Sequence, residues 1–121
     1  MHKNYFLIIS ILVTITFSCT SNVQINEQIQ SKWIVDKAMR NGRLTSTMEN
    51  GFFKFWHLDS LETNILGEKI KAHYHLDKNI IICSSELPQF TVDKAGADTL
   101  VLKTKISEYH FSFTLIKSHK K

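Results

Sequence analysis

The sequence predicts an all-β domain, a small antiparallel up-and-down barrel of about eight strands. From Lys32 onward, short stretches rich in Ile, Val, Thr, Phe, Tyr and Trp are separated by turn signals about every eight to twelve residues. No long helical pattern interrupts them, and only 4 glycines and 1 proline occur, which argues against collagen-like and disordered proteins. A chain of 121 residues has room for one domain with one core.

The turn signals give the predicted strands in order. The first strand covers Lys32–Ala38 and ends before Asn41-Gly42, a dipeptide typical of tight hairpins. An edge strand over Arg43–Met48 and a turn at 49–51 follow. The other strands are expected over Phe52–Leu58, Leu61–Leu66, Lys69–Leu76, Ile80–Cys83, Phe90–Val92, Thr99–Lys105 and His110–Ile116.

Two of these stretches alternate clearly between apolar and polar residues. Tyr74 and Leu76 alternate with His73 and His75, which predicts one buried and one solvated face. In the last strand, the inward positions are expected to be Phe111, Phe113 and Leu115. Short connections between successive strands favour a curled or closed sheet, which leaves few exposed edges.

The N-terminal segment 1–18 has the three parts of a secretory signal peptide. Lys3 precedes an apolar run over Tyr5–Phe17, and the small residue Ser18 follows. The run is shorter than the ~20 residues that cross a bilayer as a helix, so it predicts a cleaved segment and an exported protein. Residues 19–31 are expected to form a tether, or one short helical turn, before a barrel domain over 32–121.

The Ser18-Cys19 pair after the apolar run resembles the lipobox of bacterial lipoproteins. This resemblance implies that Cys19 is acylated and anchors the protein in a membrane. With Thr20, and no aspartate, directly after the cysteine, the sequence resembles those of lipoproteins that are sorted to the outer membrane and left facing the periplasm. An acylated Cys19 cannot form a disulfide with Cys83, whose apolar surroundings should raise its pKa and lower its reactivity.

Four stretches of the barrel carry a resemblance to a family. They are Lys32-Trp33-Ile34-Val35, the Phe-rich Phe52–Trp56, the turn-containing Asp59–Gly67, and Asp98-Thr99-Leu100-Val101-Leu102. In this order they resemble the small lipocalin-like lipoproteins common in Bacteroidetes. The resemblance implies a barrel whose mouth binds an apolar or amphipathic small molecule, with Trp33 closing the opposite end.

Aromatic side chains are the candidate ligand-binding residues. The set is Trp33, Phe53, Phe55, Trp56, Tyr74, Phe111 and Phe113. These side chains could line an apolar pocket, or they could fill the interior, since an eight-stranded barrel is just wide enough for side chains or one small ligand. For a chain this short, we expect a mostly filled interior.

Other functional classes receive no support from the sequence. The net charge of +4 is scattered among acidic residues, so no nucleic-acid partner is expected. His73 and His75 have a spacing at which two imidazoles can share Zn²⁺, but no third ligand lies nearby, so we expect no metal site. No nucleophile, phosphate-binding or metalloprotease motif is present, and the expectation is a non-enzymatic protein without a cofactor.

Two functions remain open. The first is a lipid-anchored binding protein that holds a small apolar ligand in the barrel mouth. The second is a protein-interaction or enzyme-inhibitor module that acts through a surface loop, with 84–89 and 40–50 as the candidate loops. An enclosed apolar cavity would favour the first function, and a solid core with one protruding loop would favour the second.

The lipobox resemblance generates a direct test. A lipoprotein's several acyl chains hold it firmly on a membrane, whereas the bare domain has no such anchor. Cys19→Ser should therefore move the protein from the membrane fraction to the soluble periplasmic fraction, as measured by cell fractionation and immunoblotting. A variant that stays with the membranes would place the anchor elsewhere.

Overall fold

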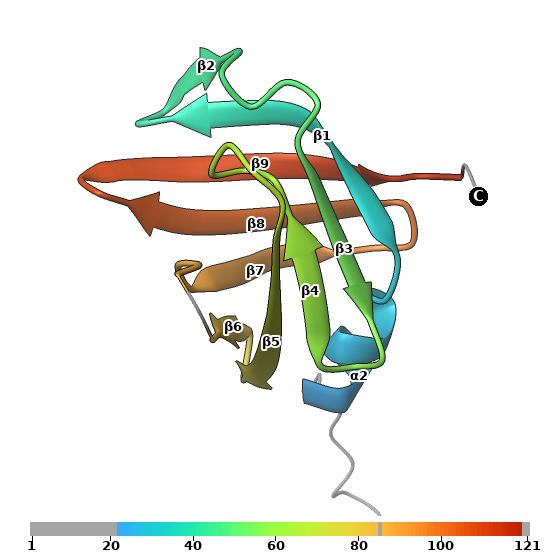
Figure 1. Cartoon of the computed structure of the whole chain (residues 1–121). Coiled ribbons are helices and arrows are strands. Elements are labelled where there is room, and N and C mark those ends of the chain that lie inside the picture. Colours follow the sequence, from blue (N-terminus) through green and yellow to red (C-terminus); the bar gives the residue numbers. More distant parts are fainter. Residues whose placement is uncertain (1–21, 85, 120–121) are drawn as a thin grey trace, which may run out of the picture.

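The computed structural model describes residues 22–84 and 86–119, in which nine strands follow one short helix. No helix in these ranges is long and apolar enough to cross a bilayer. The predicted signal peptide over 1–18 lies outside the described residues. The elements are α2 Asn22–Gln28, β1 Lys32–Arg40, β2 Arg43–Thr45, β3 Phe52–Trp56, β4 Ser60–Thr63, β5 Ile70–Asp77, β6 Ile80–Cys83, β7 Phe90–Ala95, β8 Thr99–Ile106 and β9 Tyr109–Lys117 (Figure 1).

The strands form a closed antiparallel barrel. Neighbouring strands follow the order β2-β1-β3-β4-β5-β6-β7-β8-β9, and β1 also pairs with β9. That pairing runs from Trp33↔Lys117 to Arg40↔Phe111, so eight strands close on themselves and β2 remains outside the ring. The prediction of an all-β, up-and-down antiparallel barrel is confirmed.

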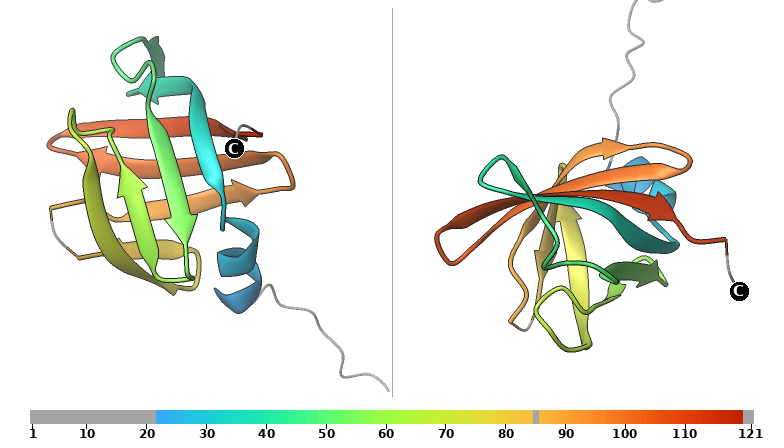
Figure 2. Two further views of the ribbon diagram at one scale, coloured as in Figure 1. Left: turned by 45° about the vertical axis from the view of Figure 1, so that its right-hand side comes forward. Right: turned by 90° about the horizontal axis from the view of Figure 1, so that it is seen from above.

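Strand β1 divides one of its edges between two neighbours. Its first residues pair with β3 from Lys32↔Lys54 to Ile34↔Phe52, and its last residues pair with β2 from Ala38↔Thr45 to Arg40↔Arg43. Strands β2 and β3 therefore diverge, and the β1–β2 hairpin rises beyond one end of the barrel, while α2 lies at the opposite end (Figures 1 and 2).

The alternating patterns predicted from the sequence reappear in the side chains. On β5, Tyr74 is buried and His73 and His75 are exposed, as predicted, while Leu76 is half-buried against the core. On β9, Phe111, Phe113 and Leu115 all point inward and are buried. Local alternation thus fixed the inward face of both strands correctly.

The segment before β1 packs against the barrel, and its described part begins with α2, in agreement with the second of the two alternatives for 19–31, a short helical turn. Ile25 and Ile29 of this segment are buried in the core, and the indole Nε1 of Trp33 donates a hydrogen bond of 2.9 Å to the Ile29 carbonyl. These apolar residues recur every four positions, the spacing of one helix face. Residues from α2 onward therefore contribute to the same core as the strands.

Aromatic rings from both sides of the barrel contact one another in its interior. The Phe53 ring lies 5.3 Å from that of Phe90 and 5.8 Å from that of Phe113, between ring centroids. The Phe55 ring lies 5.4 Å from that of Tyr74 in an edge-to-face arrangement. Such arrangements are the favourable ones for aromatic pairs, and they fill the space between β3 and the far wall.

The filled interior predicts a large cost for removing one ring. Phe113 is 0% exposed, so Phe113→Ala should lower the free energy of unfolding by about 3–5 kcal/mol. Ile116→Ala on the same strand is the control, because Ile116 is 43% exposed and should cost far less. Urea denaturation of both variants measures the difference, and equal losses would contradict a packed interior.

Candidate functional site

Most of the predicted ligand-binding residues are core residues. Trp33, Phe53, Phe55, Tyr74, Phe111 and Phe113 are all buried. Phe111 stacks on Phe113 with ring centroids 5.8 Å apart, and Phe53 and Phe55 lie nearly parallel. The structure brings these six side chains together, as the sequence predicted, but each contacts another or the surrounding core. They form the packing of the barrel, and of the six only Tyr74 also lines one of the surface clefts described below, a shallow one beside His73 and His75.

Trp56 is separated from this group. Phe53 and Phe55 point inward on β3, so Lys54 and Trp56 point outward, and the Lys54 ammonium lies 5.5 Å above the Trp56 ring. Trp56 therefore does not share the barrel interior with the other aromatic residues, and its role as a ligand contact stays a prediction. Its large apolar ring suggested burial, but the period of two along the strand places it on the outer surface.

Helix α2 closes one end of the barrel with a polar network. The Tyr74 hydroxyl donates to Asn26 Oδ1 at 2.5 Å and accepts from Gln30 Nε2 at 2.7 Å. Asn26 Nδ2 donates to the Leu58 carbonyl at 2.8 Å, and the Leu58 amide donates to Gln30 Oε1 at 3.0 Å. Trp33 is buried beneath this helix, so the closed end has both an apolar and a hydrogen-bonded layer.

The environment of Tyr74 should make the protein less stable at alkaline pH. Burial raises the pKa of Tyr74 to about 12 from its usual 10.0, and the nearby Asp59 carboxylate acts in the same direction. The folded protein thus holds this proton more tightly than the unfolded chain. The free energy of unfolding should therefore fall as pH rises from about 10 towards 12.

Tyr74→Phe tests this assignment. The variant should be less stable at neutral pH by about 1–3 kcal/mol, because Asn26 and Gln30 lose their partner. It should also lose less stability than the native protein between pH 10 and 12. Burial likewise raises the pKa of Cys83, to about 11, but that contribution is common to both proteins. Denaturant unfolding across this range provides the measurement, and identical slopes would contradict the assignment.

The histidines and Cys83 do not form a metal site in the described ranges. His73, His75 and Cys83 line a shallow cleft of about 250 Å³, but no group of three His, Cys, Asp or Glu side chains suited to a metal ion occurs among residues 22–84 and 86–119. Cys83 is half-buried, and its raised pKa keeps the unreactive thiol form at neutral pH, as the sequence predicted.

The β1–β2 hairpin, here called the arm (residues 38–45), is firmly built. Asn41 and Gly42 both have positive φ angles, of 52° and 82°, which the tightest hairpin turns require. The Asn41 amide donates to the His110 carbonyl at 2.7 Å, and the His110 amide donates to Asn41 Oδ1 at 2.9 Å. These two hydrogen bonds tie the arm to the start of strand β9, so it projects as a defined structure.

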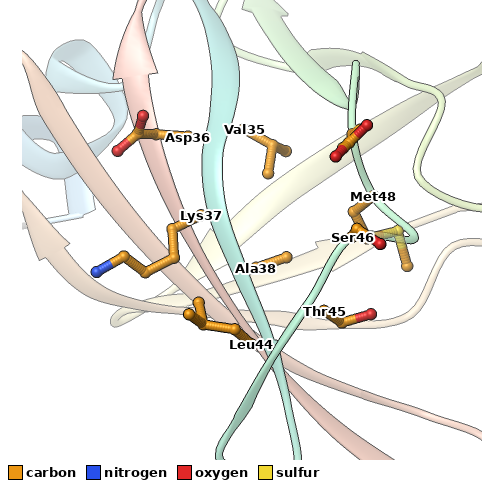
Figure 3. Close-up of a pocket in the computed structure, with 9 residues that line it drawn as sticks. Val35, Asp36, Lys37, Ala38, Leu44, Thr45, Ser46 and Met48 are labelled. Atoms are coloured by element: carbon orange, nitrogen blue, oxygen red, sulfur yellow. The ribbon is translucent and has the colours of Figure 1, made fainter.

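A cleft of about 430 Å³ lies between residues 35–38 of β1 and the segment 44–49 that follows the turn of the arm (Figure 3). Val35, Ala38 and Met48 form its apolar floor, which is continuous with the core. Buried Gly51 brings the chain back against β1, since a Cβ here would lie 2.9 Å from Val35 Cγ2. The other residues that line this cleft are Asp36, Lys37, Leu44, Thr45, Ser46 and Glu49.

A second cleft, of about 500 Å³, lies beside the tip of the arm and has a basic character. Arg40 and Arg43 line it together with Tyr109, and the Arg40 guanidinium lies 5.2 Å from the centroid of the Tyr109 ring. Leu44, 71% exposed, lines both clefts. Sequence reasoning pointed to the loop 40–50 but not to these three arm residues. The available signal was the apolar Leu44 next to a tight turn that two arginines flank.

Searches against known proteins give no relative from which a role can be transferred. No protein-family model, no curated protein and no solved structure matches this chain.

Proposed function

We propose that this protein is an exported, lipid-anchored binding module that recognises another protein through the arm and the clefts beside it. The observation that carries the proposal is the contrast between the two candidate sites. The barrel interior is occupied by aromatic rings in mutual contact, whereas Leu44 on the arm is 71% exposed.

An exposed leucine on a rigid projection is well suited to recognition. The arm is held by the hydrogen bonds between Asn41 and His110, so its residues lose little conformational freedom when they bind. Arginine and tyrosine are enriched among the residues that dominate binding energy at protein interfaces, and Tyr109 lines the cleft beside the arm together with the two arginines. The arm adds the exposed Leu44 beside these groups, and burying its side chain against a partner would contribute apolar area.

The position of the arm agrees with an N-terminal anchor at Cys19. Helix α2, the first described element after Cys19, lies at the end of the barrel opposite β2 (Figures 1 and 2). A lipid on Cys19 would therefore leave the arm directed away from the membrane, towards other proteins of the same compartment. The signal-peptide and lipobox patterns support outer-membrane anchoring with the domain facing the periplasm.

A small apolar ligand is the second candidate, and the cleft floored by Val35, Ala38 and Met48 favours it. Its volume of about 430 Å³ lies within the range of small-molecule sites. Such a ligand would lie beside the arm and not among the core aromatic residues. It would keep the binding role that the lipocalin-like resemblance implies, at a different place in the barrel.

Leu44→Ser separates the arm from the rest of the surface. Burying a leucine at an interface contributes about 1.5–3 kcal/mol. The amount of protein partner that this variant retains should therefore fall at least about tenfold. Leu58→Ser is the matched control, since Leu58 is 52% exposed near α2. The readout is the amount of partner that co-purifies with tagged mature protein, measured by quantitative mass spectrometry.

Both variants should unfold at the same denaturant concentration as the native protein, because neither leucine is buried. Equal retention of the partner by the two variants would contradict the arm as the binding site. Titration with N-phenyl-1-naphthylamine distinguishes the second candidate. Saturable one-to-one binding that Met48→Ser abolishes and Leu58→Ser preserves would show a small-molecule site in the cleft.

A further inference from the structure

We propose that the partner binds by adding a strand: an extended segment with acidic side chains pairs with the free edge of β2. This inference rests on the proposed function, because it specifies how the arm recognises a protein. Three features of the arm support it, namely the orientation of the backbone of β2, two arginines that have no carboxylate partner within the described residues, and the apolar cleft that continues from them.

The backbone of β2 offers one outward-facing donor and acceptor. Arg40 and Arg43 flank a two-residue turn, and in such hairpins the flanking residues exchange both backbone hydrogen bonds. The next residue, Leu44, lies opposite Met39 and directs its N–H and C=O away from β1. Strand β2 ends the order of paired strands in the described part of the chain, so this edge has no neighbour.

The charge of the arm selects acidic side chains. Among residues 22–84 and 86–119, neither Arg40 nor Arg43 has a carboxylate within salt-bridge distance, and the described ion pair joins Lys103 to Asp93 elsewhere. The cleft that the two arginines line contains no acidic residue. Arg40 is held over the Tyr109 ring at 5.2 Å, which orients its guanidinium before any ligand arrives.

The two clefts also define the pattern of the docked segment. Leu44 and Thr45 line both clefts, so the basic and the apolar surface follow one another along β2. Side chains two positions apart in a strand point to the same face. A segment with an acidic residue and an apolar residue at positions i and i+2 would therefore place one beside Arg43 and the other over Met48.

A second copy of this chain fits the edge poorly. Pairing of β2 with its own symmetry mate would bring two copies of Arg40 and Arg43 into one short interface. Like charges at neighbouring positions of paired strands are destabilising. An acidic partner instead neutralises both arginines, so charge complementarity selects a different protein over self-association.

Photo-crosslinking of the full-length protein in the cells that produce it tests the inference. Ser46 is exposed and lines the apolar cleft, so p-benzoylphenylalanine replaces it as the probe. The cross-linked segment of the partner, mapped by mass spectrometry, should carry at least one Asp or Glu within two residues of an apolar residue. A cross-link to this chain itself, to lipid or to glycan would overturn the proposal.

Four substitutions then separate strand addition from simple side-chain contact. Leu44→Pro removes the outward N–H but no hydrogen bond to β1, so it should lower the cross-link yield at least tenfold, whereas Leu44→Ala should lower it less. Arg43→Glu should lower the yield at least tenfold. Lys71→Glu reverses an exposed charge on β5 and should leave the yield unchanged.

The outcomes distinguish this inference from the proposed function. A partner captured as well by Leu44→Pro as by Leu44→Ala, and as well by Arg43→Glu as by the native protein, would overturn strand addition while retaining the arm as a binding surface. The absence of any cross-linked protein would overturn both. Should Leu44→Pro unfold at a lower denaturant concentration than the native protein, Arg43→Glu and the sequence of the captured segment decide the question.

Discussion

The structure depends on the pairing of β1 with strands on both of its edges. One edge pairs with β9 and closes the barrel, while the other pairs first with β3 and then with β2. The register with β9 shifts between Val35 and Lys37, where one additional residue is accommodated. Such a bulge bends a strand and increases its twist. Here it lies at the point where β1 leaves β3 and begins to pair with β2.

Strand β1 contributes residues both to the packed interior and to the arm. Trp33, near the start of β1, is buried beneath α2, and Ala38, after the bulge, contributes to the core beside β9. Arg40 and the turn at Asn41 then extend beyond the barrel, where Asn41 bonds to His110. A small barrel with a filled interior has little room for a ligand inside. Recognition is then left to the surface, and β1 carries the part of the surface that projects.

The sequence predicted the barrel well because each strand shows its inward face locally. The alternation around Tyr74 and Phe113 required knowledge of neighbouring residues only. The tip of the arm was also visible, since Asn41-Gly42 tolerates the positive φ angles of the turn. The order of the strands followed from their short connections, which favour pairing of consecutive strands.

Other features depend on contacts between residues that are far apart in the sequence. The splitting of one β1 edge between β2 and β3 leaves no local pattern, so the edge strand predicted over 43–48 extended past its true end at Thr45. Trp56 was assigned to the pocket by its residue type, although its position relative to Phe55 indicated the outer face. The residues before Lys32 left a tether and a short helical turn both open, because nothing in their local pattern shows that the barrel buries Ile25 and Ile29.

The packing of α2 against the closed end of the barrel (Figure 1) would limit how far the domain could stand from a membrane if Cys19 carried a lipid. Only Thr20 and Ser21 separate Cys19 from Asn22, the first residue of α2. Three residue steps of fully extended chain span about 11 Å, which is less than the width of a single folded domain. A lipid on Cys19 would hold the barrel close to the lipid headgroups, because the linker is too short for the domain to move far from the bilayer surface. Lateral diffusion in the plane of the bilayer would then govern encounters with partners that are themselves anchored there.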